Sequence, residues 1–351
     1  MLALALALAL GMSALTACGG GGDSGGDAEA PATEGDAQVP AAEPEYVLNY
    51  SSNDPQGSPN DEYVVQPLKK LLEEKSGGRI TLEVFYSSSL ANMGSCLEGI
   101  KNGTVDIGID VLTMYPGEYM YTELLGTPGI AFGDPAAFAT MVAEYMKAFP
   151  EKGLDSFKLI SRVSSGAFGC LSKKPVSKPG DLKGMTLRAS TNFIPWYEAM
   201  GGAGTFMPAG DIYESMKLSV IDGAHTSAMG VYDFKLYEVG GYYTFFPMTV
   251  GDQVICMSKD LYESMPDDLK AAVDEASEAM VQVTSDYVTE MEAQAQSNIL
   301  AQNPDFQFVD ITDMKGFEDA AAALLDKKAK ELDGAGLDGT GALQWLREHA
   351  A

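Results

Sequence analysis

Apolar positions in the segment 46–110 alternate between helical and strand spacing. One helical face collects four apolar side chains, Val64, Leu68, Leu71 and Leu72. Gly77-Gly78 ends this helix, and a second predicted helix at 93–102 ends at Gly103. Strands are predicted at 46–50, 79–86 and 105–109. The order βαβαβ predicts an α/β fold with a mainly parallel sheet and helices on both faces.

The segment 159–226 repeats this kind of pattern. An extended segment at 159–171 precedes a strand at 185–189 and a helix at about 192–200, and Asp211 to Glu214 resembles a capping box that opens a further helix. A ten-residue echo links the two segments, because 99–108 and 215–224 both indicate a helix end, a turn, a strand and an acid. Two lobes built on one plan would produce this echo.

One helix is predicted to run without interruption from Pro266 to Gln302. It has no internal Gly or Pro and carries apolar residues at helical spacing, and Asn303-Pro304 ends it. At 1.5 Å per residue it would span roughly 55 Å, which is longer than one lobe is wide. We therefore expect it to bridge two lobes. A strand at 306–311 and helices at about 315–332 and 341–349 follow.

Composition narrows the possible partners. The chain has 46% hydrophobic residues and a net charge of -27, and no apolar run after residue 17 has the length that a bilayer span needs. Nucleic acid is not an expected partner, because phosphate binding requires clustered Lys and Arg. The acidic field also repels anions, so an anion site has to be a local exception built from one or two buried positive groups.

The cysteines give no support for redox or zinc chemistry. Cys18, Cys96, Cys170 and Cys256 include no CxxC spacing. We expect the last three to be small buried hydrophobic residues with at most one disulfide, and we expect no metal and no cofactor.

Residues 1–18 have the pattern of a lipoprotein signal peptide. An Ala/Leu run ends in Leu15-Thr16-Ala17-Cys18, which resembles the bacterial lipobox, where the cysteine after the cleavage site is diacylated. A transmembrane anchor is the alternative interpretation. Residues 19–45 hold seven acids and no base and are predicted to form a flexible acidic linker with a reach of roughly 28 Å. These features predict an extracytoplasmic protein that is anchored to the membrane through lipidated Cys18.

Ordered motifs in the remaining chain resemble the solute-binding subunit of tripartite ATP-independent periplasmic (TRAP) transporters, the family that includes C4-dicarboxylate-binding proteins. The motifs that carry the resemblance are 102–107, 178–188, 207–213 and 221–224, together with the long helix. The resemblance implies a type II, Venus-flytrap periplasmic binding protein with two lobes that close on a ligand. Lobe 1 is expected at 46–166 plus about 252–285, and lobe 2 at 167–251 plus about 286–351.

The resemblance also implies where the ligand binds. The family's signature arginine corresponds to Arg188, whose planar guanidinium can bind a carboxylate bidentately; a structural ion pair is the alternative. Open α/β sheets bind ligands beyond the carboxyl ends of their strands, which agrees with this position. The further ligand-binding candidates are Asn53, Phe168, Trp196, Tyr213, His225 and Thr226. For Asn53 a turn-forming role is the alternative, and for Trp196 a core position.

Two departures from the family bear on the ligand. Many members carry a second arginine where this chain reads Gly166-Ala167-Phe168-Gly169, and His225-Thr226 replaces a common Glu-Asn pair. The second arginine, which would bind another anionic group of the ligand, is missing, and Phe168 adds apolar surface. The chain is therefore predicted to bind a monocarboxylate with an apolar or aromatic body rather than a small dicarboxylate or a sialic acid.

Three other functions remain as alternatives. An enzyme would have to rely on carboxylates alone, and nothing in the sequence places two of them together. The binding protein of an ATP-driven (ABC) importer would share the architecture, although the long helix favours the TRAP system. A ligand-sensing lipoprotein that signals to a receptor would have the same sequence features as a binding protein that serves a transporter. The prediction is therefore a binding protein that is not an enzyme and that delivers a small organic acid to the membrane subunits of a TRAP transporter.

Overall fold

Two long strands, β4 (Phe157–Ser172) and β8 (Tyr242–Ser258), connect the two lobes of the fold. The computed structural model describes residues 44–130 and 135–349. The predicted signal peptide, Cys18 and the linker as far as residue 43 lie outside the described residues. β4 and β8 pair antiparallel, and the register shifts between Ser164 and Ala167. The start of β4 therefore pairs with the end of β8 in the first lobe, and the end of β4 pairs with the start of β8 in the second.

Each lobe adds short parallel strands to this pair, so the sheet is mixed. The order is β2-β1-β3-β8-β4-β7-β5-β6, with β9 beside β8. The first lobe supplies β1 (Tyr46–Ser51), β2 (Ile80–Phe85) and β3 (Ile107–Asp110), and the second supplies β5 (Thr186–Arg188), β6 (Ala203–Thr205), β7 (Gly223–Thr226) and β9 (Gln307–Val309). β1 pairs parallel with β2 and β3, and β5 pairs parallel with β6 and β7, whereas β3 and β7 meet the long strands antiparallel. The predicted parallel sheet is thus correct within each lobe and wrong for the strands that join the lobes.

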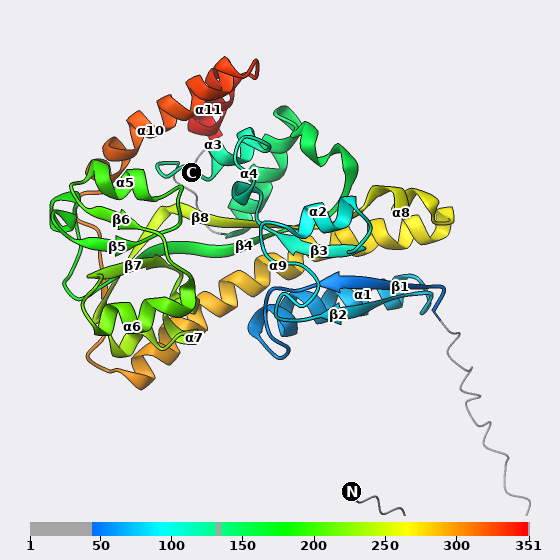
Figure 1. Ribbon diagram of the computed structural model, residues 1–351, viewed down its shortest axis with the longest axis horizontal. Coiled ribbons are helices and arrows are strands. Elements are labelled where there is room, and N and C mark those ends of the chain that lie inside the picture. The colour runs from blue at the N-terminus through cyan, green and yellow to red at the C-terminus, as the bar shows by residue number, and fades with distance from the viewer. Residues whose placement is uncertain (1–43, 131–134, 350–351) are drawn as a thin grey trace, which may run out of the picture. The chain divides into compact units, whose positions relative to one another are not determined.

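The helices that connect these strands along the chain pack against the sheet (Figure 1). The first lobe contains η1 (Asp61–Val65), α1 (Gln66–Lys75), α2 (Cys96–Lys101), η2 (Leu112–Met114), α3 (Met120–Leu125), α4 (Pro135–Ala148) and η3 (Lys152–Ser156). The second contains η4 (Pro179–Leu182), α5 (Ile194–Ala199), η5 (Ala209–Asp211), α6 (Ile212–Lys217), α7 (Ala228–Asp233) and η6 (Leu236–Glu238). Val64, Leu68 and Leu72 are buried as the helical pattern predicts. The predicted helix at 93–102 begins only at Cys96, because Gly94 has a φ of +80° and Asp110 accepts hydrogen bonds from the Gly94 and Leu97 amides.

The internal echo corresponds to a repeated structure. Asp106, which precedes β3, accepts a hydrogen bond from the main-chain amide of Asn49 on β1 at 2.8 Å. Asp222, which precedes β7, accepts one from the amide of Thr186 on β5 at 2.8 Å. Gly103 and Ser219 occupy equivalent turns, and both have positive φ, at 78° and 59°. The predicted capping box at Asp211 is wrong, because the Asp211 side chain makes no capping hydrogen bond to α6.

The predicted long helix is α9 (Asp267–Gln302), which has 36 residues and no break. Leu269, Val273 and Met280 pack in the core of the first lobe, and Ala295 and Ile299 pack in the core of the second. One helix therefore contributes to both cores, which agrees with the expectation that it bridges the lobes. Figure 1 shows α9 running from α8 (Lys259–Ser264) to the region of α6 and α7.

A second helix is also shared between cores. In α10 (Met314–Gly334), Phe317 and Ala321 pack beside Trp196 in the second lobe, whereas Leu325 and Leu332 join the cluster formed by α3, α4 and α11 (Gly339–His349). Residues from about 286 to 351 were all expected in lobe 2, but the end of α10 and α11 pack on α3 and α4, which belong to the segment that was expected in lobe 1.

Cys96, Cys170 and Cys256 are free, buried thiols, and burial raises the pKa of Cys96 and of Cys170 to about 12. Each lies in an apolar cluster, as expected for small buried hydrophobic residues. Within residues 44–130 and 135–349, no helix combines the length and apolarity that a bilayer span requires.

Candidate ligand-binding site

Arg188 is the last residue of β5, at the carboxyl end of the parallel strands of the second lobe. Its Nε donates to the carbonyl oxygen of Met207 at 3.0 Å, and its Nη1 donates to the carbonyl oxygen of His225 at 3.1 Å. A guanidinium has five N–H donors, so three remain after these two bonds. No carboxylate of the described residues forms an ion pair with Arg188, and its burial lowers its pKa. The site thus holds an uncompensated, partly buried positive charge, and the structural ion pair that was the alternative interpretation is not present in the described part of the chain.

His225 on β7 forms an aromatic cluster next to this charge. Its ring centroid lies 4.2 Å from that of Phe193, 5.2 Å from that of Phe168 and 5.6 Å from that of Tyr197. Burial, and secondarily the nearby Arg188 charge, lower the pKa of His225 from 6.5 to about 3. The imidazole is therefore neutral near pH 7 and adds no second positive charge. Phe168 is half-buried at the edge of this cluster.

Thr226 and Asn53 lie at strand ends in opposite lobes. Thr226 ends β7, where its carbonyl oxygen accepts from the Tyr243 hydroxyl at 3.0 Å, and it is half-buried. Asn53 follows β1, and its side chain donates to the carbonyl oxygen of Ile109 at 3.4 Å and accepts from the Ser88 hydroxyl at 3.2 Å. Both residues lie at the carboxyl ends of parallel strands, where α/β folds usually bind ligands.

Trp196 and Tyr213 are not part of this group. Trp196 has no exposed surface, its indole Nε1 donates to the carbonyl oxygen of Phe317 at 3.0 Å, and it packs between Phe246 and Phe317. It is therefore a core residue, which was the alternative interpretation, and it does not form a wall of a cleft. The hydroxyl of Tyr213 donates to Glu238 at 2.7 Å, a local contact between α6 and η6.

Phe193 was not among the candidates from the sequence, and it belongs to the ring cluster beside Arg188. It stands five residues after Arg188 in the loop that opens α5, and among the described rings that contact His225 its centroid is the nearest, at 4.2 Å. An aromatic residue just after the strand-end arginine is the signal that could have indicated it.

Residues of both lobes line two depressions. One has a volume of about 290 Å³ and is lined by Thr113 and Thr127 of the first lobe and by Thr191, Asn192 and Pro195, which follow Arg188. The Asn192 side chain crosses between the lobes and donates to the carbonyl oxygen of Gly126 at 3.1 Å. The second depression, of about 210 Å³, is lined by segments that follow β1 and β7 and by α9.

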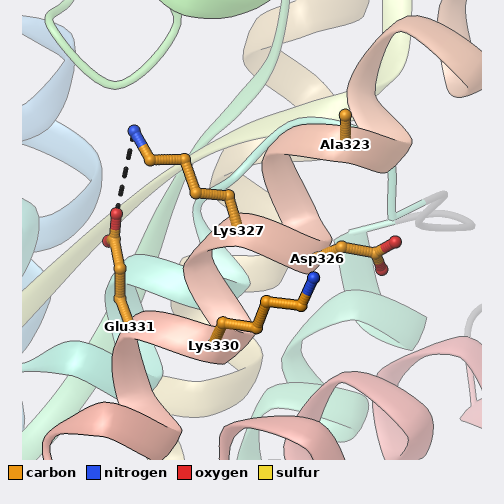
Figure 2. Close-up of a pocket in the computed structure, with 5 residues that line it drawn as sticks. All are labelled: Ala323, Asp326, Lys327, Lys330 and Glu331. Atoms are coloured by element: carbon orange, nitrogen blue, oxygen red, sulfur yellow. Dashed lines mark ion pairs between the residues drawn. The ribbon is translucent and has the colours of Figure 1, made fainter.

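A third depression lies along α10 and is lined by residues of that helix alone (Figure 2). Figure 2 shows Lys327 directed toward Glu331, with which it pairs at 3.8 Å. Its lining residues all come from a single helix, so it does not have the construction of a site between lobes.

The comparisons with known proteins agree with this architecture. Residues 50–331 match the family model of bacterial extracellular solute-binding proteins, family 7. The chain is 26% identical over 231 residues to a solute-binding protein of Chromohalobacter salexigens, which covers 64% of this chain and 68% of the relative.

Two solved structures of TRAP solute-binding proteins show the same fold. One, from Roseobacter denitrificans with bound β-D-glucuronate, has a TM-score of 0.73 and 20% identity and covers 86% of this chain and 98% of its own. The other, from Rhodoferax ferrireducens with copurified benzoate, has a TM-score of 0.77 and 20% identity and covers 87% and 97%. The chain therefore has the two-lobed fold of TRAP solute-binding proteins, and it belongs to the bacterial extracellular solute-binding protein family 7.

Proposed function

We propose that this protein captures a small organic monocarboxylate with an apolar or aromatic body and delivers it to the membrane subunits of a TRAP transporter. It acts by binding and not as an enzyme. The observation that carries this proposal is the Arg188 guanidinium, which is partly buried at the strand ends without a carboxylate partner among the described residues. A buried charge without a partner is costly, and a bound carboxylate removes that cost.

Arg188 would bind the carboxylate with its remaining donors. Its hydrogen bonds to Met207 and His225 hold the guanidinium plane, so little conformational entropy is lost when the ligand binds. Two parallel N–H donors then face the two carboxylate oxygens, which is the strong bidentate arrangement.

The neighbouring rings favour an apolar ligand body. Phe168, Phe193 and neutral His225 present ring surfaces beside Arg188 and no second positive charge. A dicarboxylate would leave its second carboxylate without a cation from this group. The Rhodoferax ferrireducens protein holds benzoate, which has the proposed chemistry, while the Roseobacter denitrificans protein holds glucuronate, whose hydroxyl groups need additional hydrogen-bonding partners. The cluster of rings beside Arg188 favours the first kind of ligand here.

Closure of the lobes would complete the site. The proposed lobes are 46–166 with about 252–285 and 167–251 with about 286–351, except that the end of α10 and α11 pack with the first. Ligand contacts from Thr226 in the second lobe and from Asn53 in the first would favour the closed state.

The lipid anchor at Cys18 and the linker that follows it are proposed from the sequence. Leu15-Thr16-Ala17-Cys18 would direct export and diacylation of Cys18, and residues 19–45 would link the binding domain to the outer face of the membrane. A lipid attached to Cys18 would be detected as a mass increase after expression in a bacterial host, and Cys18→Ala would remove it.

Mass spectrometry of small molecules released from the purified protein tests the ligand site. We expect an organic monocarboxylate from the wild type and from Arg347→Ala, a matched change of an exposed arginine on α11. Arg188→Ala should lose this molecule while it keeps the circular dichroism spectrum of the wild type. Retention of the carboxylate by a folded Arg188→Ala protein would remove Arg188 from the site.

A further inference from the structure

The turn between α6 and β7 exposes apolar side chains that the core of the second lobe does not use. Leu218 is 71% exposed and Val220 is 62% exposed, and these are the two most exposed large apolar residues in the described part of the chain. Ser219 stands between them with a left-handed backbone, at a φ of 59°. Two aliphatic side chains therefore stand in solvent, two positions apart on one turn.

Hydrogen bonds fix this turn in its exposed position. The Lys173 ammonium donates to the main-chain carbonyl oxygen of Met216 and to the hydroxyl of Ser219, the second at 2.9 Å. The Val220 amide donates to the carbonyl oxygen of Ser215 at 2.9 Å. The exposure of the two aliphatic side chains is thus a property of the folded turn and not of a loose end.

Lysines lie on both sides of the turn, because neighbouring strands of the sheet end or begin there. The carbonyl oxygen of Asp222 accepts from the Lys173 amide at 3.2 Å, and its carboxylate accepts from the Thr186 amide at 2.8 Å. These bonds bring together the segments that follow β4, precede β7 and precede β5. The segments carry Lys173, Lys174 and Lys183, and none of these three forms an ion pair with a described residue.

The charge of this region differs from that of the whole chain. Residues 167–251 hold seven bases and seven acids, whereas the chain has a net charge of -27. The acids closest to the turn in sequence are engaged, since Asp222 accepts from an amide and Glu214 pairs with Lys217 at 3.5 Å. Acids farther away than about 10 Å are largely screened at an ionic strength of 0.1 M. The turn therefore presents apolar side chains inside a local group of lysines.

We propose that this surface, which we name the Leu218 patch (Leu218, Val220, Lys173, Lys174 and Lys183), docks on an anionic phospholipid surface. Leu218 and Val220 would enter the boundary between headgroups and acyl chains, and the lysine ammonium groups would contact lipid phosphates. The complementary charge selects anionic lipid. Two aliphatic side chains on a protruding turn supply far less than the area of about 800 Å² per partner that a stable protein interface buries, which disfavours a protein as the occupant.

The Leu218 patch and the candidate ligand site lie at opposite ends of the same strands. The patch is at the amino ends of β5 and β7, whereas Arg188 is at the carboxyl end of β5. A docked patch would therefore leave the ligand site clear and hold the second lobe at the membrane, where a transporter subunit can receive the ligand.

Cosedimentation with phospholipid vesicles tests the proposal on the chain from residue 19, which lacks Cys18 and so carries no lipid of its own. Residues 42–351 form one compact unit, which this chain keeps whole. We expect vesicles of equal parts phosphatidylglycerol and phosphatidylcholine to bind at least about tenfold more tightly than vesicles of phosphatidylcholine alone. The combined change Leu218→Ser and Val220→Ser should weaken binding about tenfold, and so should Lys174→Gln with Lys183→Gln.

Matched changes elsewhere on the surface are the controls. Val281→Ser, at a valine of α9 that is 54% exposed, and Lys330→Gln, at an exposed lysine of α10, should each leave vesicle binding within about twofold of the wild type. Arg188→Ala should also bind vesicles as the wild type does, whatever its effect on carboxylate binding.

Three results would overturn the Leu218 patch as a lipid-docking surface without touching the role of Arg188. They are absence of binding to the phosphatidylglycerol vesicles, equal binding to both vesicle compositions, and unchanged binding after the changes at Leu218 and Val220. If sedimentation velocity instead shows a dimer that these two changes dissociate, the occupant is a second copy of this chain and the lipid assignment is wrong.

Discussion

Arg188 Nη1 donates a hydrogen bond to the main-chain carbonyl oxygen of His225 at 3.1 Å, which joins the ends of the neighbouring strands β5 and β7. The bond fixes the guanidinium beside the imidazole ring, and the positive charge contributes to the low pKa of His225. The contact therefore places a fixed positive charge beside a ring that is neutral near pH 7.

The neutral state of His225 predicts a specific pH dependence of stability. Its pKa falls from 6.5 to about 3 in the folded protein, mainly through burial. The unfolded chain therefore binds more protons below pH 6.5, and the contribution of His225 to stability is lost by about 1.4 kcal/mol per pH unit as the pH falls from 6.5 toward 3. Urea unfolding at several pH values should show a smaller slope in this window for His225→Gln than for the wild type, and His349→Gln, an exposed matched change, should keep the wild-type slope. An equal slope in all three proteins would mean that His225 is protonated in the folded state.

Glu292 predicts a dependence of the opposite sign at higher pH. Both carboxylate oxygens are inaccessible to solvent, and burial raises the pKa of Glu292 from 4.5 to about 7 against a smaller lowering effect of the Ala228 main-chain amide. The folded protein holds the proton longer than the unfolded chain, so the free energy of unfolding should decrease as the pH rises from about 4.5 to 7. Glu292→Gln should gain about 2 kcal/mol relative to the wild type between pH 5 and pH 8. Glu290→Gln, at an exposed position of α9, should show no such gain, and a Glu292→Gln difference that does not change with pH would contradict the buried, raised pKa.

Phe168 predicts selectivity for the ligand body. Its half-buried ring lies 5.2 Å from the His225 ring beside Arg188. Phe168→Ala should raise the Kd for benzoate about tenfold because ring contact and apolar burial are lost, whereas the Kd for propionate should change little. Phe206→Ala, at a phenylalanine that is 57% exposed, is the control and should leave both affinities unchanged. Equal losses for benzoate and propionate would place Phe168 away from the ligand body.

The backbone conformation of Ser219 predicts that glycine at this position is more stable than alanine. It has a φ of +59° at the turn where the equivalent Gly103 has +78°. A left-handed backbone costs a residue with a Cβ about 1 kcal/mol, so Ser219→Gly should be about 1 kcal/mol more stable than Ser219→Ala in urea unfolding. Both variants lack the hydroxyl that accepts from Lys173 at 2.9 Å, so their comparison isolates the backbone. If Ser219→Ala equals or exceeds Ser219→Gly, the turn stores no such strain.

Periodicity predicted the elements that are long or have clear ends. The helix 266–302 could be predicted because 36 residues repeat one apolar face without Gly or Pro. Strand β8 could not, because Pro247 and Gly251 interrupt its pattern, and it continues only because β4 pairs with it on both sides of a register shift. α3, with six residues, is too short to show a helical period.

The candidate ligand site, like the fold, could be predicted from the sequence only in part. A basic residue at the end of a strand after a turn indicates a ligand position, and Arg188 lies at a strand end without an ion pair among the described residues. Trp196 was expected at the cleft, but it is fully buried, because α5 has only six residues and the sequence does not show which of its faces is buried. The contact that holds Trp196 in the core, with Phe317, joins residues 121 positions apart and leaves no local signal in the sequence.

Isothermal titration of ligand-free protein with benzoate tests the role of Arg188 most directly. The wild type and Arg347→Ala should bind it with equal Kd, Arg188→Lys should bind at least about tenfold more weakly because an ammonium lacks the planar fork, and Arg188→Ala should show a loss of about a hundredfold or more. If a folded Arg188→Ala protein bound benzoate with the wild-type Kd, the guanidinium would not be the carboxylate site.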